Sequence, residues 1–207
     1  MKTLQTRHLG KKQQAGFTII ELVVVILLLG ILTATALPRF MNISDEAHQA
    51  VVDATLGSLR TGLALYRAQW LAEGQPAPAT AVSYDGSNLF PEVAGGGYPS
   101  SADGTQSSEA DCLAVLTGLI TFGGLGTDDA AFNAAAATLE TNIETVALST
   151  IDWVAVPSAA AAPFNCVYYY VGQFKSGTVA GPRTVQTLTY TVTTGVVTTG
   201  TFTMNNG

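Results

Sequence analysis

Apolar residues fall into three regions of this chain, each with its own pattern. Residues 17–37 are almost continuously apolar, residues 52–70 repeat apolar side chains every three or four positions, and several segments after residue 150 are rich in Val, Thr and Tyr. These patterns predict a membrane-length helix, an amphipathic helix and β-strands, respectively. The fold class is therefore α+β: one long kinked N-terminal helix packs on an antiparallel sheet of about four strands.

The apolar segment 17–37 contains a single charged residue, Glu21. A helix of this length spans roughly 30 Å, the thickness of the hydrocarbon core of a bilayer. Residues 1–16 carry four of the nine basic residues and no acid, whereas the rest of the chain carries five basic and all fifteen acidic residues. Because basic flanks stay in the cytoplasm, we expect a cytoplasmic N-terminus, a membrane helix and an exported acidic body.

Three interpretations of this segment compete. A secretory signal peptide fits the basic start, but the apolar run is long and Thr33–Ala36 is a weak cleavage site. A plain membrane anchor fits the length. Neither explains Glu21, because a carboxylate inside an apolar segment is costly unless it is protonated or paired. A tolerated carboxylate at the membrane interface is the alternative to a functional one.

The sequence Gly16-Phe17-Thr18-Ile19-Ile20-Glu21, followed by the apolar run, resembles the class III signal of type IV prepilins. The resemblance implies that a prepilin peptidase removes residues 1–16 by cutting between Gly16 and Phe17, and that the new N-terminus of Phe17 is methylated. The segment Leu37-Pro38-Arg39-Phe40 and the residues after it further resemble the mannose-sensitive haemagglutinin group of pilins.

Glu21 lies four residues after Phe17, one helical turn from the new α-amine. Within one chain, this pair of charges could neutralise itself. In a bundle of identical helices, Glu21 of one subunit can reach the Phe17 ammonium of a neighbour, and only one axial offset pairs these charges. By resemblance to pilins, Phe17 and Glu21 are the assembly residues.

Gly30 and Pro38 are the residues at which we expect the helix to weaken. Proline removes a backbone hydrogen bond and clashes with the preceding turn, and glycine lowers helix propensity. The resemblance to pilins implies that residues 30–38 can lose helical structure in a filament. A mild proline kink without melting is the alternative for the free protein.

Residues 39–74 continue as the amphipathic half of the same helix, which should end at Glu73–Gly74 before a proline-rich turn. The predicted core stripe is Val52, Leu56, Leu59, Leu63, Tyr66 and Trp70. Arg60 and Arg67 lie off this stripe.

Residues 75–207 form the predicted globular body. Its first part, residues 75–110, is rich in Gly, Pro, Ser and Asp and predicts an exposed loop with a short strand near residues 81–84. The apolar segment 112–120 is ambiguous in type, and residues 128–146 predict a short helix. The predicted strands are Ile151–Val156, Cys166–Phe174, Thr184–Thr193 and Val196–Met204, with a hairpin turn at Gly195.

Cys112 and Cys166 are the two cysteines of the chain, and in an exported protein they can form one disulfide. Two free cysteines are the alternative. The resemblance to pilins, which commonly carry such a bridge in the C-terminal part of the body, supports the pairing.

Two histidines, two cysteines and the acidic balance argue against an enzyme, a metal or cofactor site and a nucleic-acid-binding surface. After cleavage only His48 would remain, and we expect it at the surface or at a subunit contact. Asp103 and Asp111 could bind a cation only weakly, because no calcium-loop spacing surrounds them.

The leading hypothesis is a structural subunit of a type IV pilus that polymerises through its N-terminal helix and supports adhesion, attachment or motility. Its expected partners are other copies of itself, the prepilin peptidase, the inner-membrane assembly platform, the membrane and an unknown surface receptor. The subunit would lie in the inner membrane before assembly and in an extracellular filament afterwards. A minor pilin or secretion-system pseudopilin is the first alternative, and a membrane-anchored binding or enzymatic ectodomain is the second.

Overall fold

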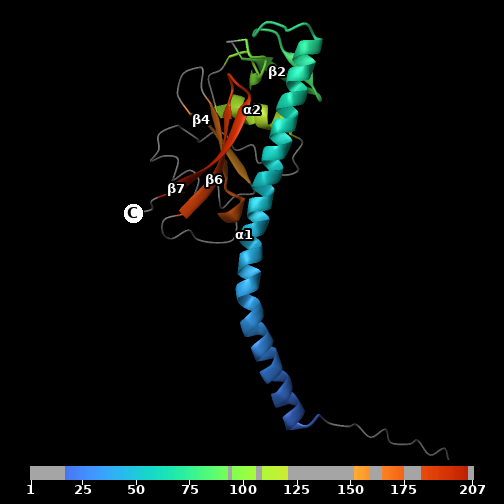
Figure 1. The fold of residues 1–207 in the computed structure, drawn as a ribbon, viewed down its shortest axis with the longest axis vertical. Coiled ribbons are helices and arrows are strands. Elements are labelled where there is room, and N and C mark those ends of the chain that lie inside the picture. The colour runs from blue at the N-terminus through green and yellow to red at the C-terminus, as the bar shows by residue number, and fades with distance from the viewer. Residues whose placement is uncertain are drawn as a thin grey trace, which may run out of the picture. The chain divides into compact units, whose positions relative to one another are not determined.

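The computed structural model describes residues 17–92, 95–105, 109–120, 152–158, 165–174 and 183–204 (Figure 1). The chain divides into two compact units, Met1–Glu46 and Ala47–Gly207. The leader, residues 1–16, and the predicted helix at residues 128–146 lie outside the described residues. Helix α1, Ile19–Ala72, belongs to both units.

Helix α1 is continuous through Gly30 and Pro38. Residues 30–38 are therefore helical in this single subunit, as in the alternative of a proline that leaves the helix unmelted. Two polar side chains near this stretch are satisfied within the helix, because the hydroxyls of Thr33 and Thr35 donate to carbonyls three and four residues earlier at 2.9–3.3 Å. Loss of helix in a filament stays a prediction.

The C-terminal end of α1 has the hydrogen bonds of a Schellman motif. The Gln75 N–H donates to the Trp70 carbonyl at 2.9 Å, and the Gly74 N–H donates to the Leu71 carbonyl at 3.2 Å. Gly74 has φ +81°, a conformation that a glycine adopts without steric cost. The predicted helix end at Glu73–Gly74 is thus confirmed.

In the unit Ala47–Gly207, the predicted stripe of α1 forms one wall of the hydrophobic core. Val52, Leu59, Leu63, Tyr66 and Trp70 are buried, and Leu56 packs against the core from a half-buried position. The helix ribbon in this unit runs alongside the sheet, as Figure 1 shows. The period of three and four residues was therefore a correct guide to the buried face.

The larger sheet has four antiparallel strands in the order β4-β5-β6-β7. They are β4 (Trp153–Pro157), β5 (Cys166–Tyr170), β6 (Arg183–Thr191) and β7 (Val196–Met204). All four overlap the predicted strands, and the predicted hairpin joins β6 to β7 with Gly195 at φ +71°. A short 3₁₀ turn, Gly172–Phe174, takes the last part of the predicted second strand.

A smaller antiparallel sheet, β1-β2-β3, lies in the stretch that the sequence predicted as loop. Its strands are β1 (Val82–Tyr84), β2 (Ser87–Pro91) and β3 (Pro99–Ser101). The first was predicted, whereas the loop prediction was wrong for β2 and β3. Their few residues, with a proline in each, show no alternation that could be read as a strand.

The apolar segment of ambiguous type is helix α2, Glu109–Leu119. Cys112, Val115, Leu116 and Leu119 are buried in the same core as α1 and the larger sheet. Gly62 of α1 allows this helix to come close, since a Cβ built there would lie 2.7 Å from the Leu119 carbonyl oxygen. The two helices therefore meet at a glycine.

Two kinds of link cross this core. Cys112 and Cys166 form the predicted disulfide, with Cα atoms 5.4 Å apart, and join α2 to β5. Three buried tyrosines donate hydroxyl hydrogen bonds to backbone carbonyls: Tyr66 to Leu89 at 2.9 Å, Tyr168 to Cys112 at 3.0 Å and Tyr190 to Pro99 at 2.8 Å. Burial raises the pKa of each of these phenols well above its usual value.

Candidate assembly surfaces

The first candidate surface is the N-terminal part of α1. Ile19–Ala36 has a mean hydropathy of 2.7, is long enough to cross a membrane, and is not buried anywhere along its length. A run of apolar side chains that finds no partner in its own chain needs lipid or other protein around it. Phe17, just before the helix, is 88% exposed.

Glu21 forms a capping box with Thr18 at the start of this helix. The Thr18 N–H and hydroxyl both donate to Glu21 Oε2, at 3.0 and 2.8 Å, and the Glu21 N–H donates to Thr18 Oγ1 at 3.3 Å. These bonds satisfy free N–H groups of the first turn and place the carboxylate at the positive end of the helix. Sequence reasoning missed the role of Thr18, although the spacing Thr-x-x-Glu before an apolar run is the signal for it.

The capping box leaves the second carboxylate oxygen of Glu21 available. Both bonds from Thr18 end on Oε2, and no described residue donates to Oε1. An ionised carboxylate offers about four lone pairs in all. Glu21 can therefore hold its own helix end and accept a cation from another chain at the same time.

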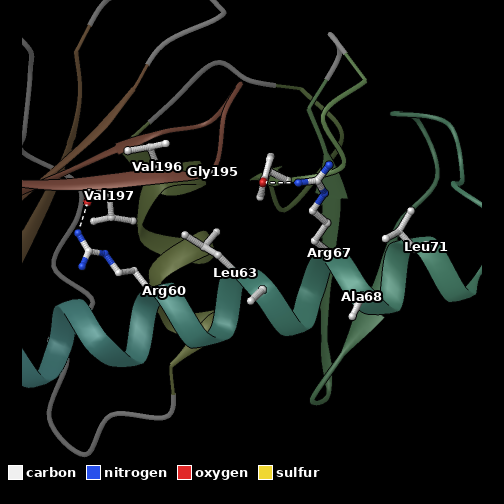
Figure 2. Close-up of a pocket in the computed structure, with 10 residues that line it drawn as sticks. Arg60, Leu63, Arg67, Ala68, Leu71, Gly195, Val196 and Val197 are labelled. Carbon is white, nitrogen blue, oxygen red and sulfur yellow. Dashed lines mark hydrogen bonds between the residues drawn. The ribbon is translucent and has the colours of Figure 1, made fainter.

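A second candidate surface is a groove of about 590 Å³ in the unit Ala47–Gly207. It lies between α1 and the hairpin that joins β6 to β7, as Figure 2 shows. Arg60 donates to the Val197 carbonyl at 2.8 Å, and Arg67 donates to the Tyr98 hydroxyl at 2.6 Å. Leu71 and Val196 line the groove and are about half exposed.

Arg67 is held by two contacts with the same ring. Its guanidinium carbon lies 4.8 Å from the centroid of Tyr98, within the range of a cation–π interaction, in addition to the hydrogen bond to the hydroxyl. Tyr98 in turn packs where Gly195 leaves room, because a Cβ at Gly195 would lie 2.1 Å from the ring. The hairpin glycine thus fixes both the turn and the position of the arginine.

The remaining candidate residues occupy structural positions. A ring nitrogen of His48 lies 2.9 Å from the Tyr170 hydroxyl, so His48 is a half-buried link between α1 and β5 rather than a free surface residue. Asp103 accepts the backbone N–H and hydroxyl of Thr105, and these bonds lower the pKa of its carboxyl. Asp111 is buried and accepts the Ala102 N–H. Within the described ranges, no cluster of three His, Cys, Asp or Glu side chains could hold a metal ion.

Comparison with known proteins gives one sequence motif and several partial matches. Residues 11–37 match the prokaryotic N-terminal methylation motif. The type IV narrow pilus major component PilA5 of Thermus thermophilus is 49% identical over 61 residues, which cover 30% of this chain and 51% of that protein. The type IV major fimbrial protein FimA of Dichelobacter nodosus is 32% identical over 93 residues, or 45% of this chain and 54% of that protein.

A secretion component matches over a similar length. The type II secretion system core protein G of Pseudomonas aeruginosa is 37% identical over 57 residues, which cover 28% of this chain and 40% of that protein. The chain thus spans about half the length of the curated relatives it matches. No solved structure gives a significant match. The methylation motif and these partial matches make the N-terminal part of the chain similar to type IV pilus proteins and to a type II secretion system core protein.

Proposed function

We propose that this chain is a structural subunit of a type IV pilus, which polymerises through the N-terminal half of α1. The observation that carries the proposal is the methylation motif at residues 11–37, which continues into an apolar helix whose side chains have no partner in their own subunit. The pilus proteins among the relatives support the same function.

In this proposal the prepilin peptidase cuts between Gly16 and Phe17, and Phe17 carries the methylated amine. Before assembly the subunit lies in the inner membrane, with Ile19–Ala36 in the bilayer. The assembly platform then moves it into an extracellular filament. Glu21 then pairs with the Phe17 ammonium of a neighbouring copy. The capping box supports this role, because Thr18 donates to Oε2 of Glu21 and none of the described residues donates to Oε1.

A pseudopilin of a type II secretion system is the second candidate, favoured by the match to core protein G. Both candidates share the cleaved leader and the exposed helix, so the processing site does not separate them. The abundance of the chain in surface filaments distinguishes a pilus subunit from a pseudopilin. The ligand of such a pilus, and its closer relation to the mannose-sensitive haemagglutinin group, stay predictions.

The experiment is mass analysis of filaments sheared from cells that express the full chain. A pilus subunit would be the major protein of the sheared fraction, with an N-terminal peptide that starts at methylated Phe17. Wild-type cells whose chain is cleaved but absent from sheared filaments would favour the pseudopilin. A chain that keeps residues 1–16 would contradict both.

A further inference from the structure

The turn between β1 and β2 is a two-residue hairpin with a charged tip. Tyr84 pairs with Ser87, and the two residues between them, Asp85 and Gly86, have φ of +46° and +83°. Positive φ at both central positions is typical of a type I′ turn, which Asn-Gly, Asp-Gly and Gly-Gly all form. Both tip residues are exposed, and a Cβ at Gly86 would meet nothing within 4 Å. The turn therefore requires no charge, yet the chain places a carboxylate at its tip.

The Asp85 carboxylate differs from the other exposed carboxylates that the structure describes after residue 46. Asp53 and Glu73 each accept a hydrogen bond from a glutamine four residues earlier. Asp103 accepts two hydrogen bonds from a threonine two residues later. No described residue donates to Asp85. Its charge is therefore left for a group outside the described part of its own chain.

The groove between α1 and the β6–β7 hairpin, named here the Arg60–Arg67 groove, carries the opposite charge. Arg60 and Arg67 are two of only five basic residues that follow position 16, against fifteen acids. Their hydrogen bonds go to neutral oxygens of Val197 and Tyr98, and no described carboxylate pairs with either guanidinium. Because a guanidinium has five N–H donors, each arginine keeps donors for another chain. The groove is thus a cationic, half-apolar surface on an acidic protein.

The hairpin tip and the groove lie on opposite sides of α1, within the same compact unit. Tyr84, next to the tip, lines a hollow of about 460 Å³ together with Ser58 of α1. Ser58 and Arg67 are nine residues apart, about two and a half turns of helix, so their side chains point in opposite directions. Figure 2 shows Arg60 and Arg67 rising from one side of α1 toward the β6–β7 hairpin. A copy that offers its tip to one neighbour therefore keeps its groove open to another on the opposite side.

Resting on the proposed pilus function, we propose that the Asp85–Gly86 tip of one copy enters the Arg60–Arg67 groove of a neighbouring copy, where Asp85 pairs with Arg67. Charge complementarity favours a second copy as the occupant, because the tip carries an acid and the groove a base that no described residue of their own chain neutralises. Arg67 is the better partner of the two arginines, since Tyr98 already holds it through a hydrogen bond and a ring contact. Less side-chain freedom is then lost when the pair forms.

Apolar side chains border both surfaces. Leu71 and Val196 line the groove and are 50% and 52% exposed, and Leu65, which lines the hollow beside Tyr84, is 53% exposed. Burial of such side chains supplies most of the free energy of a contact, whereas an exposed ion pair contributes little by itself. The Asp85–Arg67 pair selects the orientation in which these apolar borders meet.

This contact joins two different surfaces, so it does not close on itself. Each copy fills the groove of one neighbour and receives the tip of another. Such heterologous contacts generate open polymers. The contact uses only residues of the unit Ala47–Gly207, so it is independent of the pairing proposed for Glu21 and adds to it.

The test is chemical cross-linking of filaments sheared from cells that express the full chain in two forms. A mixture of Asp85→Cys and Arg67→Cys chains, treated with a short bis-maleimide and no reductant, should give cross-linked dimers. The matched mixture of Asp85→Cys and Ser58→Cys chains should give at least about tenfold fewer, because Ser58 faces the opposite side of α1. Equal yields from the two mixtures, or as many dimers from Asp85→Cys alone, would overturn the proposal.

A double-mutant cycle on the dissociation temperature of the filaments measures the charge pair itself. Asp85→Asn keeps the turn, since Asn also adopts positive φ, and removes only the charge. Asp85→Asn and Arg67→Gln should each lower this temperature by a few degrees, and the double variant by less than their sum, because either change alone already breaks the pair. Glu73→Gln, at an exposed acid already bonded within its own chain, should leave the temperature unchanged. Additive losses, or wild-type behaviour of Asp85→Asn, would show that the two charges do not meet.

Monomer in the membrane fraction, with the Cys112–Cys166 bond closed on a non-reducing gel, shows that each variant folds. If the Arg67 variants fail this check, Ala68→Cys, at an exposed residue of the groove, takes the place of Arg67→Cys, and the comparison with Ser58→Cys decides the result in the same way. Wild-type filaments are the reference throughout, so a failed cross-link leaves the proposed pilus function standing. A wild-type chain absent from filaments would instead remove that function and this contact with it.

Discussion

Two glycines of α1 give a matched test of how this helix meets α2. Gly57 and Gly62 lie in the same helix, five positions apart, and both lack a side chain. A Cβ at Gly57 would meet nothing within 4 Å, whereas a Cβ at Gly62 would lie 2.7 Å from the Leu119 carbonyl oxygen and 3.1 Å from its Cβ. The same substitution to alanine should therefore change stability in opposite directions.

The magnitudes follow from two effects. Alanine is more favourable than glycine inside a helix by about 0.8–1.0 kcal/mol, and this gain applies to both positions. At Gly62 the new methyl group must displace a backbone carbonyl at the end of α2, an overpacking that costs about 1–3 kcal/mol. Gly57→Ala should then stabilise the protein by about 0.8 kcal/mol. Gly62→Ala should be less stable than Gly57→Ala by about 1–3 kcal/mol.

The assay is urea unfolding of the full chain in detergent micelles. Trp70 and Trp153 are both buried in the core of the unit Ala47–Gly207, so tryptophan fluorescence reports the unfolding of that unit. Comparing the two variants cancels the propensity term and leaves the cost of the contact. If both variants gain the same stability, α1 and α2 do not approach at Gly62 as described, and the packing argument is refuted.

Three further predictions concern the links within and between subunits. Reducing the Cys112–Cys166 bond should lower the free energy of unfolding by roughly 4 kcal/mol for a loop of this length, measured by urea unfolding with and without reductant. Tyr190→Phe should cost about 1–3 kcal/mol in the same assay, because it leaves the buried carbonyl of Pro99 without its donor. Glu21→Val should abolish sheared filaments but leave cleaved monomer in the membrane, since an unpaired buried ammonium costs about 3–5 kcal/mol at every subunit; normal filament yield would show that the carboxylate does not set the register.

The parts of the fold that sequence predicted well share one property, a long repeat. The stripe from Val52 to Trp70 repeats over about five turns of helix, and in β6 Leu188 and Tyr190 alternate with threonines. In both cases one face is more buried than the other, so apolar side chains recur in the sequence with the period of the element. The hairpin between β6 and β7 adds a turn signal at Gly195, because a positive φ in such a turn favours glycine.

The parts that sequence predicted poorly depend on neighbours far along the chain. Strands β2 and β3 pair with each other, and β2 forms the centre of its sheet although it ends in Pro91. Glu92 is buried there and accepts the Gly96 N–H, in a segment whose composition reads as exposed loop. Helix α2 is apolar on several sides because α1 and the sheets surround it, so no amphipathic period distinguishes it from a strand.

The candidate site was predicted in one half and missed in the other. Glu21 was noticeable because a charge in an apolar run is anomalous in any sequence, and the motif around it specifies one interpretation. Arg60 and Arg67 are unremarkable as single exposed residues, since arginines on the outer face of an amphipathic helix are expected. Their significance comes from the hairpin and Tyr98, which shape a groove around them, and that contact spans more than a hundred residues of sequence.

One helix here has two surfaces that were shaped by different surroundings. From Ile19 to Ala36 none of the helix is buried by the described residues, and in the proposed pilus subunit the membrane and then neighbouring copies supply the environment for that face. From Val52 onward the same helix buries its apolar stripe against its own body, although Leu65 and Leu71 stay exposed. In the proposed filament, apolar contact between the first halves of α1 does not discriminate among axial offsets, because one leucine meets another equally well one turn away. A point charge does discriminate, and the chain places Glu21 at the start of this helix. The physical consequence is that apolar contact supplies attraction between copies whereas the charge selects their register, so loss of the Glu21 carboxylate should stop the ordered growth of a filament.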